Sequence, residues 1–145
     1  MKLLFRRLRG EAVLPQRGTP ASAGLDLSAC IAEPFTIAPQ EIRMVPTGLA
    51  AAPDRPDVML MLCARSGLAA KHGIGMANGV GIVDSDYRGE ICVPLINQSR
   101  EPFTVTPGMR IAQLIAVPVF LPEPLEAEEL PDTERGAGGF GHTGT

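Results

Sequence analysis

The amino-acid sequence predicts an all-β fold, and three observations support this prediction. Short apolar stretches recur along the 145 residues, and 14 prolines and 16 glycines separate them. Strand-length and helix-length stretches do not alternate, as they would in a chain with a parallel sheet. The hydrophobic content of 45% is enough for one domain with its own core. We therefore expect a sandwich or barrel of short strands.

Nine stretches are expected to form the strands, because each holds apolar or β-branched residues between glycine, proline or polar residues. They are residues 2–8, 24–29, 35–37, 41–45, 58–63, 80–83, 90–96, 103–105 and 111–119. The stretches 80–83 and 90–96 are expected to pair as a hairpin across a polar turn that ends at Gly89. One short helix is expected at residues 66–73, with Ser66 as its N-cap and Gly73 as its end.

The composition changes at Pro122. Glutamate and proline dominate the residues that follow, and glycine is frequent in residues 135–145. Such a segment has too few apolar residues to pack a core and is expected to be mobile until something orders it. We therefore expect a β-domain at residues 1–121 and a flexible, glycine-rich C-terminal arm at residues 122–145.

Charge and composition argue against several classes of function. The formal net charge of −3 and the pI near 5.4 argue against a nucleic-acid partner, which needs a basic face. No apolar run is long enough to span a membrane, and arginines end the first apolar stretch too early for a signal peptide. No CxxC pair occurs among the three cysteines, Cys30, Cys63 and Cys92. All three are expected to be reduced core thiols. We expect a cytoplasmic protein without membrane or nucleic-acid partners.

The polar turn between residues 83 and 91 holds more charged and polar side chains than a turn needs. Asp84, Asp86, Tyr87, Arg88 and Glu90 are crowded together there, and the tyrosine is the only one in the chain. One or two such residues suffice to fix a turn. A solvated acidic turn is the structural explanation of this crowding, and a binding site is the functional one.

Four further polar residues occur at three places among apolar segments. Asp26 lies between two leucines, Arg65 and Ser66 precede the expected helix, and Gln113 lies within the last expected strand. Each has an ordinary explanation, as an exposed strand position, a helix cap or an outward-facing amide. An arginine beside the amides of a helix N-terminus is also a good phosphate ligand.

Five polar segments follow one another along the chain, at residues 23–27, 65–69, 78–90, 108–114 and 135–145. Their sequences are AGLDL, RSGLA, NGVGIVDSDYRGE, GMRIAQL and RGAGGFGHTGT. In order and approximate spacing they resemble the five motifs of the trimeric dUTPase family. The resemblance implies a jelly-roll-like β-barrel, a homotrimer with active sites at its subunit interfaces, and hydrolysis of dUTP to dUMP and pyrophosphate with Mg²⁺. Such an enzyme limits uracil incorporation into DNA and supplies dUMP for dTTP synthesis.

The resemblance also implies roles in catalysis. Asp84 matches the general base that takes a proton from the water attacking the α-phosphorus, and Gln113 and Ser66 match residues that contact the phosphates or this water. Asp26 matches an aspartate that holds waters around the magnesium ion. We therefore expect indirect metal binding, through water, and no cage of protein ligands.

The other matched residues are expected to bind substrate. Tyr87 matches a tyrosine that packs on the deoxyribose and leaves no room for a 2′-hydroxyl, and small glycines allow the backbone to approach uracil closely. In the arm, glycine amides are expected to face phosphate, with Phe140 on the base. The full set expected to bind substrate is Arg65, Ser66, Gly67, Asn78, Gly81, Val83, Asp84, Tyr87, Gln113, Arg135, Gly138, Gly139, Phe140 and Gly141.

Two alternative functions stay open at this point. A dCTP deaminase of the same fold would need a carboxylate that activates water against the base, and Glu90 is the candidate. A trimeric nucleotide-binding or regulatory protein without catalysis would need the pocket but not the base Asp84.

Overall fold

The computed structural model describes residues 1–139, which contain eleven strands and one helix. The helix α1 is Ser66–His72. The strands are β1 (Leu3–Arg7), β2 (Leu25–Ser28), β3 (Phe35–Ile37), β4 (Ile42–Pro46), β5 (Leu49–Pro53), β6 (Val58–Ala64), β7 (Ile74–Met76), β8 (Gly81–Val83), β9 (Cys92–Asn97), β10 (Phe103–Val105) and β11 (Arg110–Pro118).

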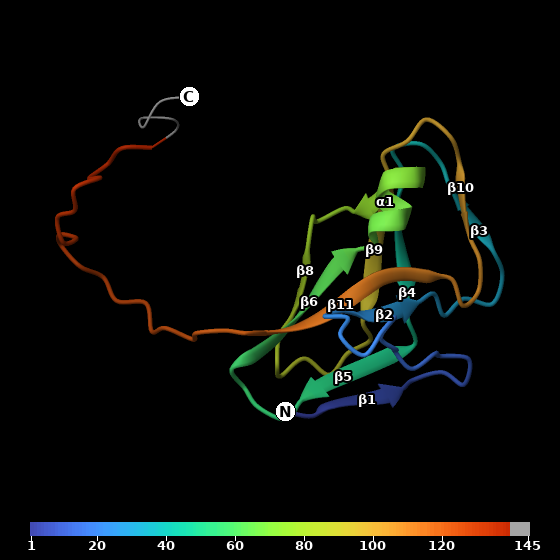
Figure 1. Cartoon of the computed structure of the whole chain (residues 1–145), viewed down its shortest axis with the longest axis horizontal. Coiled ribbons are helices and arrows are strands. Elements are labelled where there is room, and N and C mark those ends of the chain that lie inside the picture. The colour runs from blue at the N-terminus through green and yellow to red at the C-terminus, as the bar shows by residue number, and fades with distance from the viewer. Residues whose placement is uncertain (140–145) are drawn as a thin grey trace.

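The strands form four small antiparallel sheets (Figure 1). The largest has the order β2-β11-β6-β8, and a second has the order β4-β9-β7. β1 pairs with β5, and β3 pairs with β10. The prediction of an all-β fold with one short helix is confirmed. Within residues 1–139 the sheets are separate and are not joined into one continuous ring of hydrogen bonds.

One hydrophobic core joins these sheets. In β6 and β9, residues that are buried alternate with residues that are half-buried, which is the period of a pleated strand. Leu49, Leu60, Val93, Ile37 and Leu114 are at most 1% exposed, and together they come from all four sheets. Burial of their apolar surface therefore holds the sheets in a single domain.

All nine expected strands are present, with ends shifted by at most two residues, but two strands were not predicted. The unpredicted strand β5 contains three consecutive alanines, which have a low strand propensity, and it is buried along most of its length without alternation. The other, β7, has only three residues and directly follows α1. Local pattern alone does not identify strands of these two kinds.

The predicted hairpin is wrong, because β8 and β9 belong to different sheets. Val83 in β8 lies opposite Leu60 in β6, while Val93 in β9 lies opposite Val45 in β4. Both edges of β9 are occupied, by β4 and by β7, so no edge is left for β8. Residues 84–91 therefore form a link that crosses from one sheet to the other, and we call them the crossing link.

The predicted helix is confirmed, but its predicted N-cap is wrong. Arg65 has the extended backbone of an N-cap (φ −82°, ψ 127°), and Ser66 is the first helical residue. The Arg65 side chain makes no capping bond, and its Nε donates to Asp26 instead. Because the Arg65 backbone is extended, the chain stays extended from β6 up to the helix. Gly73 ends the helix as predicted, with φ +64°, and its N–H donates to the Ala69 carbonyl at 3.0 Å.

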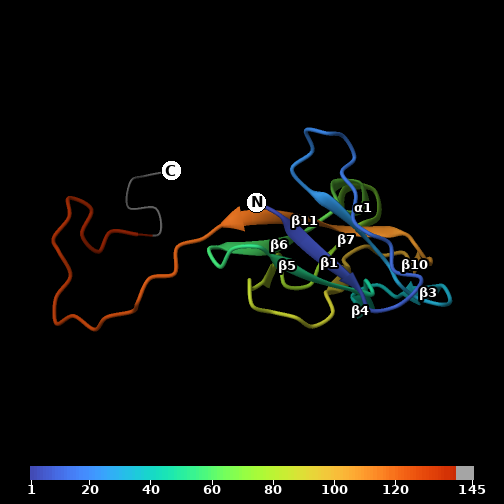
Figure 2. The ribbon, with the colours of Figure 1, turned by 90° about the horizontal axis from the view of Figure 1, so that it is seen from below.

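The chain leaves the body of the protein after β11. The N–H of Val119 still donates to the Asp57 carbonyl at 2.9 Å. Beyond it the chain runs away from the sheets, as Figures 1 and 2 show from two directions. Phe120, Leu125 and Leu130 are at least 80% exposed. The boundary between residues 121 and 122 stays a prediction.

Candidate active site

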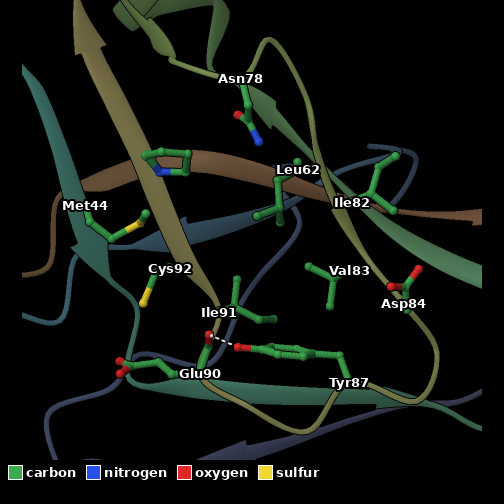
Figure 3. Close-up of a pocket in the computed structure, with 12 residues that line it drawn as sticks. Met44, Leu62, Asn78, Ile82, Val83, Asp84, Tyr87, Glu90, Ile91 and Cys92 are labelled. Carbon is green, nitrogen blue, oxygen red and sulfur yellow. Dashed lines mark hydrogen bonds between the residues drawn. The ribbon is translucent and has the colours of Figure 1, made fainter.

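A cavity of about 310 Å³ lies between the end of β8, the start of β9 and the crossing link (Figure 3). Five of the residues expected to bind substrate line it: Asn78, Gly81, Val83, Asp84 and Tyr87. The rest of the lining is mainly apolar and consists of Met44, Leu62, Ile82, Glu90, Ile91, Cys92 and Pro94. Apolar walls with a few polar groups at the edge suit a planar base with a polar rim.

Two glycines allow close packing against residues that line the cavity. A Cβ atom at Gly81 would lie 3.0 Å from the Leu62 Cβ atom. A Cβ atom at Gly89 would lie only 2.3 Å from the Tyr87 hydroxyl oxygen. Any side chain at Gly89 would therefore displace the Tyr87 ring, which makes this glycine part of the site. Sequence reasoning had treated Gly89 only as the end of a turn.

Asp84 and Tyr87 are joined by a tight turn at the mouth of the cavity. The N–H of Tyr87 donates to the Asp84 carbonyl at 3.2 Å, and the Tyr87 hydroxyl donates to the Glu90 carbonyl at 3.1 Å (Figure 3). The Asp84 side chain is exposed, and 46% of Tyr87 is accessible to solvent. A carboxylate in this position is open to water and can accept a proton from it.

The Glu90 side chain is occupied by contacts on another part of the molecule. Its Oε1 accepts the Gly48 N–H at 2.8 Å, and its Oε2 accepts from Arg9 Nη2 at 3.0 Å. Figure 3 shows the Glu90 and Asp84 carboxylates on opposite sides of the cavity. Two bonds to fixed donors favour a structural role for this carboxylate over activation of water.

A second polar cluster lies around Asp26, whose side chain is only 11% exposed. Arg65 Nε lies 3.2 Å from Asp26 Oδ1, and Arg110 Nη1 lies 3.0 Å from Oδ2. Gln113, which is opposite Asp26 across the β2–β11 ladder, donates through Nε2 to Oδ1 at 3.4 Å. Three expected site residues, Asp26, Arg65 and Gln113, are thus brought together. Arg110 adds a second ion pair to the same carboxylate.

Ser66 and Gly67 extend this cluster toward solvent. Both are exposed and form the first turn of α1, directly after Arg65. The first N–H groups of a helix have no partner within it. Apart from its chain neighbours and the backbone of α1, no atom lies within 4 Å of where a Cβ of Gly67 would be, so a ligand has room to approach this backbone.

The cavity and the Asp26 cluster are well separated within one chain. Along β6, Val83 lies opposite Leu60, whereas Gln113 lies opposite Cys63 on the other edge. Three residues along a strand and two strand spacings across the sheet correspond to a separation of about 14 Å. One chain therefore does not place Asp84 and Gln113 on the same water molecule.

The arm residues lie apart from both groups. Arg135 Nε donates to the Gly138 carbonyl at 2.9 Å, within the arm itself. Figure 1 shows this part of the arm away from the sheets. The structure therefore does not bring Arg135, Gly138 and Gly139 to the cavity of the same chain. Phe140 and Gly141, also expected to bind substrate, lie outside the described residues.

The cysteines are free, and one of them lines the cavity. Cys30 is buried, while Cys63 and Cys92 are half-buried. Burial raises the pKa of the Cys92 thiol, and the nearby negative charge of Glu90 raises it further. Cys92 alternates with buried Val93 along β9 and so faces the cavity together with Pro94. Cys92 and Pro94 were not predicted as cavity residues, because β9 is apolar at nearly every position and its sequence does not show which side faces the cavity.

Residues 1–139 contain no group of three or more histidine, cysteine, aspartate or glutamate side chains arranged to hold a metal ion. The same residues include no helix with the length and apolar character needed to cross a bilayer.

Comparison with known proteins identifies the family. The dUTPase family model matches residues 10–144. The chain is 49% identical over 144 residues to the deoxyuridine 5'-triphosphate nucleotidohydrolase of Desulfitobacterium hafniense (strain DSM 10664 / DCB-2), covering 99% of this chain and 95% of the relative. It is 50% identical over 145 residues to the protein of that name from Hydrogenovibrio crunogenus, with the same coverage.

A solved structure shows the same similarity in three dimensions. A mutant of the Staphylococcus bacteriophage 80alpha dUTPase with dUpNHpp superposes with a TM-score of 0.88 at 26% identity, covering 99% of each chain. The family match spans nearly the whole sequence and includes the five polar segments except for the last residue of the fifth. This chain therefore belongs to the dUTPase family.

Proposed function

We propose that this chain is a dUTP diphosphatase, which hydrolyses dUTP to dUMP and pyrophosphate. One observation carries this proposal: the exposed Asp84 carboxylate stands at the mouth of a mostly apolar cavity of base size, beside Tyr87. The curated relatives are named deoxyuridine 5'-triphosphate nucleotidohydrolases, and the similar phage enzyme was solved with dUpNHpp. The proposed substrate thus agrees with both the site and the relatives.

The reaction needs a base, and Asp84 supplies it. Asp84 takes a proton from water while the water oxygen bonds to the α-phosphorus. The bond from this phosphorus to the oxygen that bridges to the β-phosphorus breaks, and pyrophosphate leaves with the bonding electrons. Uracil lies in the cavity lined by Asn78, Gly81 and Val83, and Tyr87 packs against the deoxyribose.

The charge of the triphosphate is met by the cluster around Arg65. The guanidinium has five N–H donors, of which Nε bonds Asp26 and Nη1 bonds the Arg110 carbonyl. Donors are therefore left for phosphate oxygens. The N–H groups of Ser66 and Gly67 at the start of α1, the Ser66 hydroxyl and the Gln113 amide complete this anion site.

Mg²⁺ is proposed to accompany the triphosphate. Asp26 fits this role, because its carboxylate oxygens can accept hydrogen bonds from the waters that Mg²⁺ keeps. It does not fit direct ligation well, since Arg65, Arg110 and Gln113 already occupy its oxygens. When bound, the ion neutralises phosphate charge as it builds up in the transition state.

A homotrimer with sites at its subunit interfaces is the proposed assembly. A general base and a second group on the same water must each lie within about 3 Å of it. Within one chain, Val83, the residue before Asp84, is already separated from Gln113 by about 14 Å. A neighbouring copy that supplies the Asp26 cluster to the cavity satisfies both requirements. The arm, with Arg135, Gly138 and Gly139, is proposed to close over the bound nucleotide.

A cytoplasmic location is also proposed. It is supported by three cysteines that are free in the structure, as expected in a reducing compartment.

Product analysis tests the proposed function. The purified protein is incubated with dUTP, dCTP or UTP and Mg²⁺, and pyrophosphate and ammonia are measured. We expect pyrophosphate from dUTP and little from dCTP or UTP. Ammonia from dCTP would instead support the deaminase alternative, and absence of both products with retained dUTP binding would support a regulatory protein.

A further inference from the structure

Glu90 connects two distant parts of the chain to the substrate cavity. Its carboxylate accepts from Arg9, which follows β1, and from the N–H of Gly48, which lies between β4 and β5. These partners are 81 and 42 residues away in the sequence. The Arg9 side chain is 46% exposed and that of Glu90 22%, so solvent screens the ion pair more than the part-buried bond from the Gly48 N–H.

Residues 47–49, which include the Gly48 donor, are tied to the backbone of Ile91. The Thr47 hydroxyl donates to the Ile91 carbonyl at 2.6 Å, and the Ile91 N–H donates to the Leu49 carbonyl at 2.8 Å. Gly48 has φ +69°, and a Cβ atom there would lie 2.7 Å from Cys30 Sγ. Residues 47–49 are therefore closely packed and hydrogen-bonded to residue 91, and Glu90 accepts its backbone bond from this buried segment.

Tyr87 in turn is bonded to Glu90. Its hydroxyl donates to the Glu90 carbonyl at 3.1 Å (Figure 3), and its ring lies against Gly89, where no side chain fits. With 46% of the residue exposed, Tyr87 is not held by burial alone. The position of the Glu90 backbone therefore determines where the ring lies at the edge of the cavity.

We propose that Glu90 is a positioning residue for sugar selection: the Arg9 and Gly48 contacts fix its carbonyl, which fixes the Tyr87 ring against the deoxyribose. This inference rests on the proposed function and assigns the role to two residues, Glu90 and Arg9, that are not among those expected to bind substrate. A ring held in place excludes a 2′-hydroxyl by contact, whereas a ring free to move admits it. Glu90 and Arg9 thus act on the choice between dUTP and UTP.

The first test measures kcat/KM for dUTP and for UTP. In Glu90→Ala we expect the ratio of the two values to fall about tenfold, the size of effect that one small group has on discrimination in a pocket. Glu90→Gln keeps an oxygen for the Gly48 N–H and loses the charge pair, so its ratio should lie between those of wild type and Glu90→Ala. Retention of the full ratio in both variants would overturn the proposal.

The second test observes Tyr87 without any turnover. The chain has one tyrosine and no tryptophan, so its intrinsic fluorescence reports on Tyr87 alone. We expect Glu90→Ala to lower the fluorescence anisotropy and to increase quenching by acrylamide. Unchanged anisotropy and quenching would show that Glu90 does not hold the ring, whatever the kinetics.

Glu41 provides a matched control. Its carboxylate likewise accepts one backbone N–H, from Ala38 at 2.7 Å, and pairs with one arginine, Arg43, at 3.3 Å. None of these three residues lines the cavity. Glu41→Ala should leave both the dUTP to UTP ratio and the Tyr87 fluorescence at wild-type values. A similar change in both variants would indicate a general loss of stability and would contradict positioning.

A double-mutant cycle separates action through Tyr87 from action by another route. In a Tyr87→Phe background, which lacks the hydroxyl, Glu90→Ala should change the ratio by no more than about twofold, because two groups acting on one contact are not additive. Full additivity would overturn the proposal. If the wild-type protein fails to hydrolyse dUTP, the proposed function fails, while the fluorescence result still decides whether Glu90 holds Tyr87.

Discussion

Asp84 is the residue on which the proposed chemistry depends. Asp84→Asn keeps the size and polarity of the side chain and removes its ability to accept a proton. We expect kcat for dUTP to fall by roughly two to four orders of magnitude, the usual contribution of a positioned base. Binding of dUTP, measured by calorimetry, should change little.

Asp86→Asn is the matched control for this prediction. Asp86 is exposed and lies two residues along the same link, but it does not line the cavity. Its substitution should leave kcat within a few-fold of wild type, as expected for an ordinary surface residue. Turnover near wild type in Asp84→Asn would exclude that residue as the base.

Cys92 offers a second prediction at the residue scale. Burial raises the pKa of its thiol above the ordinary value of 9.0, so folding favours the neutral form. This stability is present below the ordinary pKa and is lost as pH rises through the higher pKa of the folded state. The free energy of unfolding, measured with urea, should therefore fall more between pH 8 and pH 10.5 for wild type than for Cys92→Ser. Equal pH dependence in the two proteins would contradict the shift.

At the scale of secondary-structure elements, the sequence identifies strands better than it identifies their partners. The pattern of short apolar stretches bounded by glycine, proline or polar residues located β6 and β9 to within two residues at each end. It contains no information about which edges meet, so the expected hairpin was wrong. β5, with its three alanines, had no alternation to detect.

The same limit applies to the site. Asn78, Gly81 and Tyr87 were predicted, because they lie together in one motif, and the structure places them on one cavity. The Arg9–Glu90 pair was not predicted, because its members are 81 residues apart and neither is unusual in its own segment. Contacts of this kind follow from packing and have no local sequence signal.

The arm is the element whose removal tests its proposed role. Deletion of residues 135–145 should reduce kcat/KM for dUTP about a hundredfold, the order of effect of losing groups that position a substrate. The melting temperature should change by less than about 2 °C, because the described part of this segment makes few contacts with the sheets (Figure 2). A large fall in melting temperature would instead make the arm a structural element.

At the scale of the whole molecule, the separation between Asp84 and Arg65 predicts complementation between inactive variants. Asp84→Asn and Arg65→Ala proteins are mixed, unfolded and refolded together, and dUTP turnover is measured. If each site takes these residues from different chains, about a quarter of the sites regain both in a random homotrimer. Turnover should therefore recover to about a quarter of the wild-type value.

Refolding each variant alone is the control for this experiment, and it should give no recovery. If both residues of each site instead came from one chain, the mixture of the two variants would give no recovery either. Such a result would contradict sites shared between subunits and leave the proposed chemistry in place.

Residues 120–139 run exposed from the body of the protein and stay covalently attached to it, and this attachment sets the local concentration of the arm. A lid tethered by a covalent chain is present near its site at an effective concentration of about millimolar, whatever the protein concentration in the cell. Weak contacts are then enough to close it, and weak contacts also release quickly. If the arm closes over the nucleotide as proposed, a tethered lid of this kind would protect the triphosphate during hydrolysis without trapping dUMP afterwards, and a free peptide of the same sequence would have to be supplied at millimolar levels to replace it.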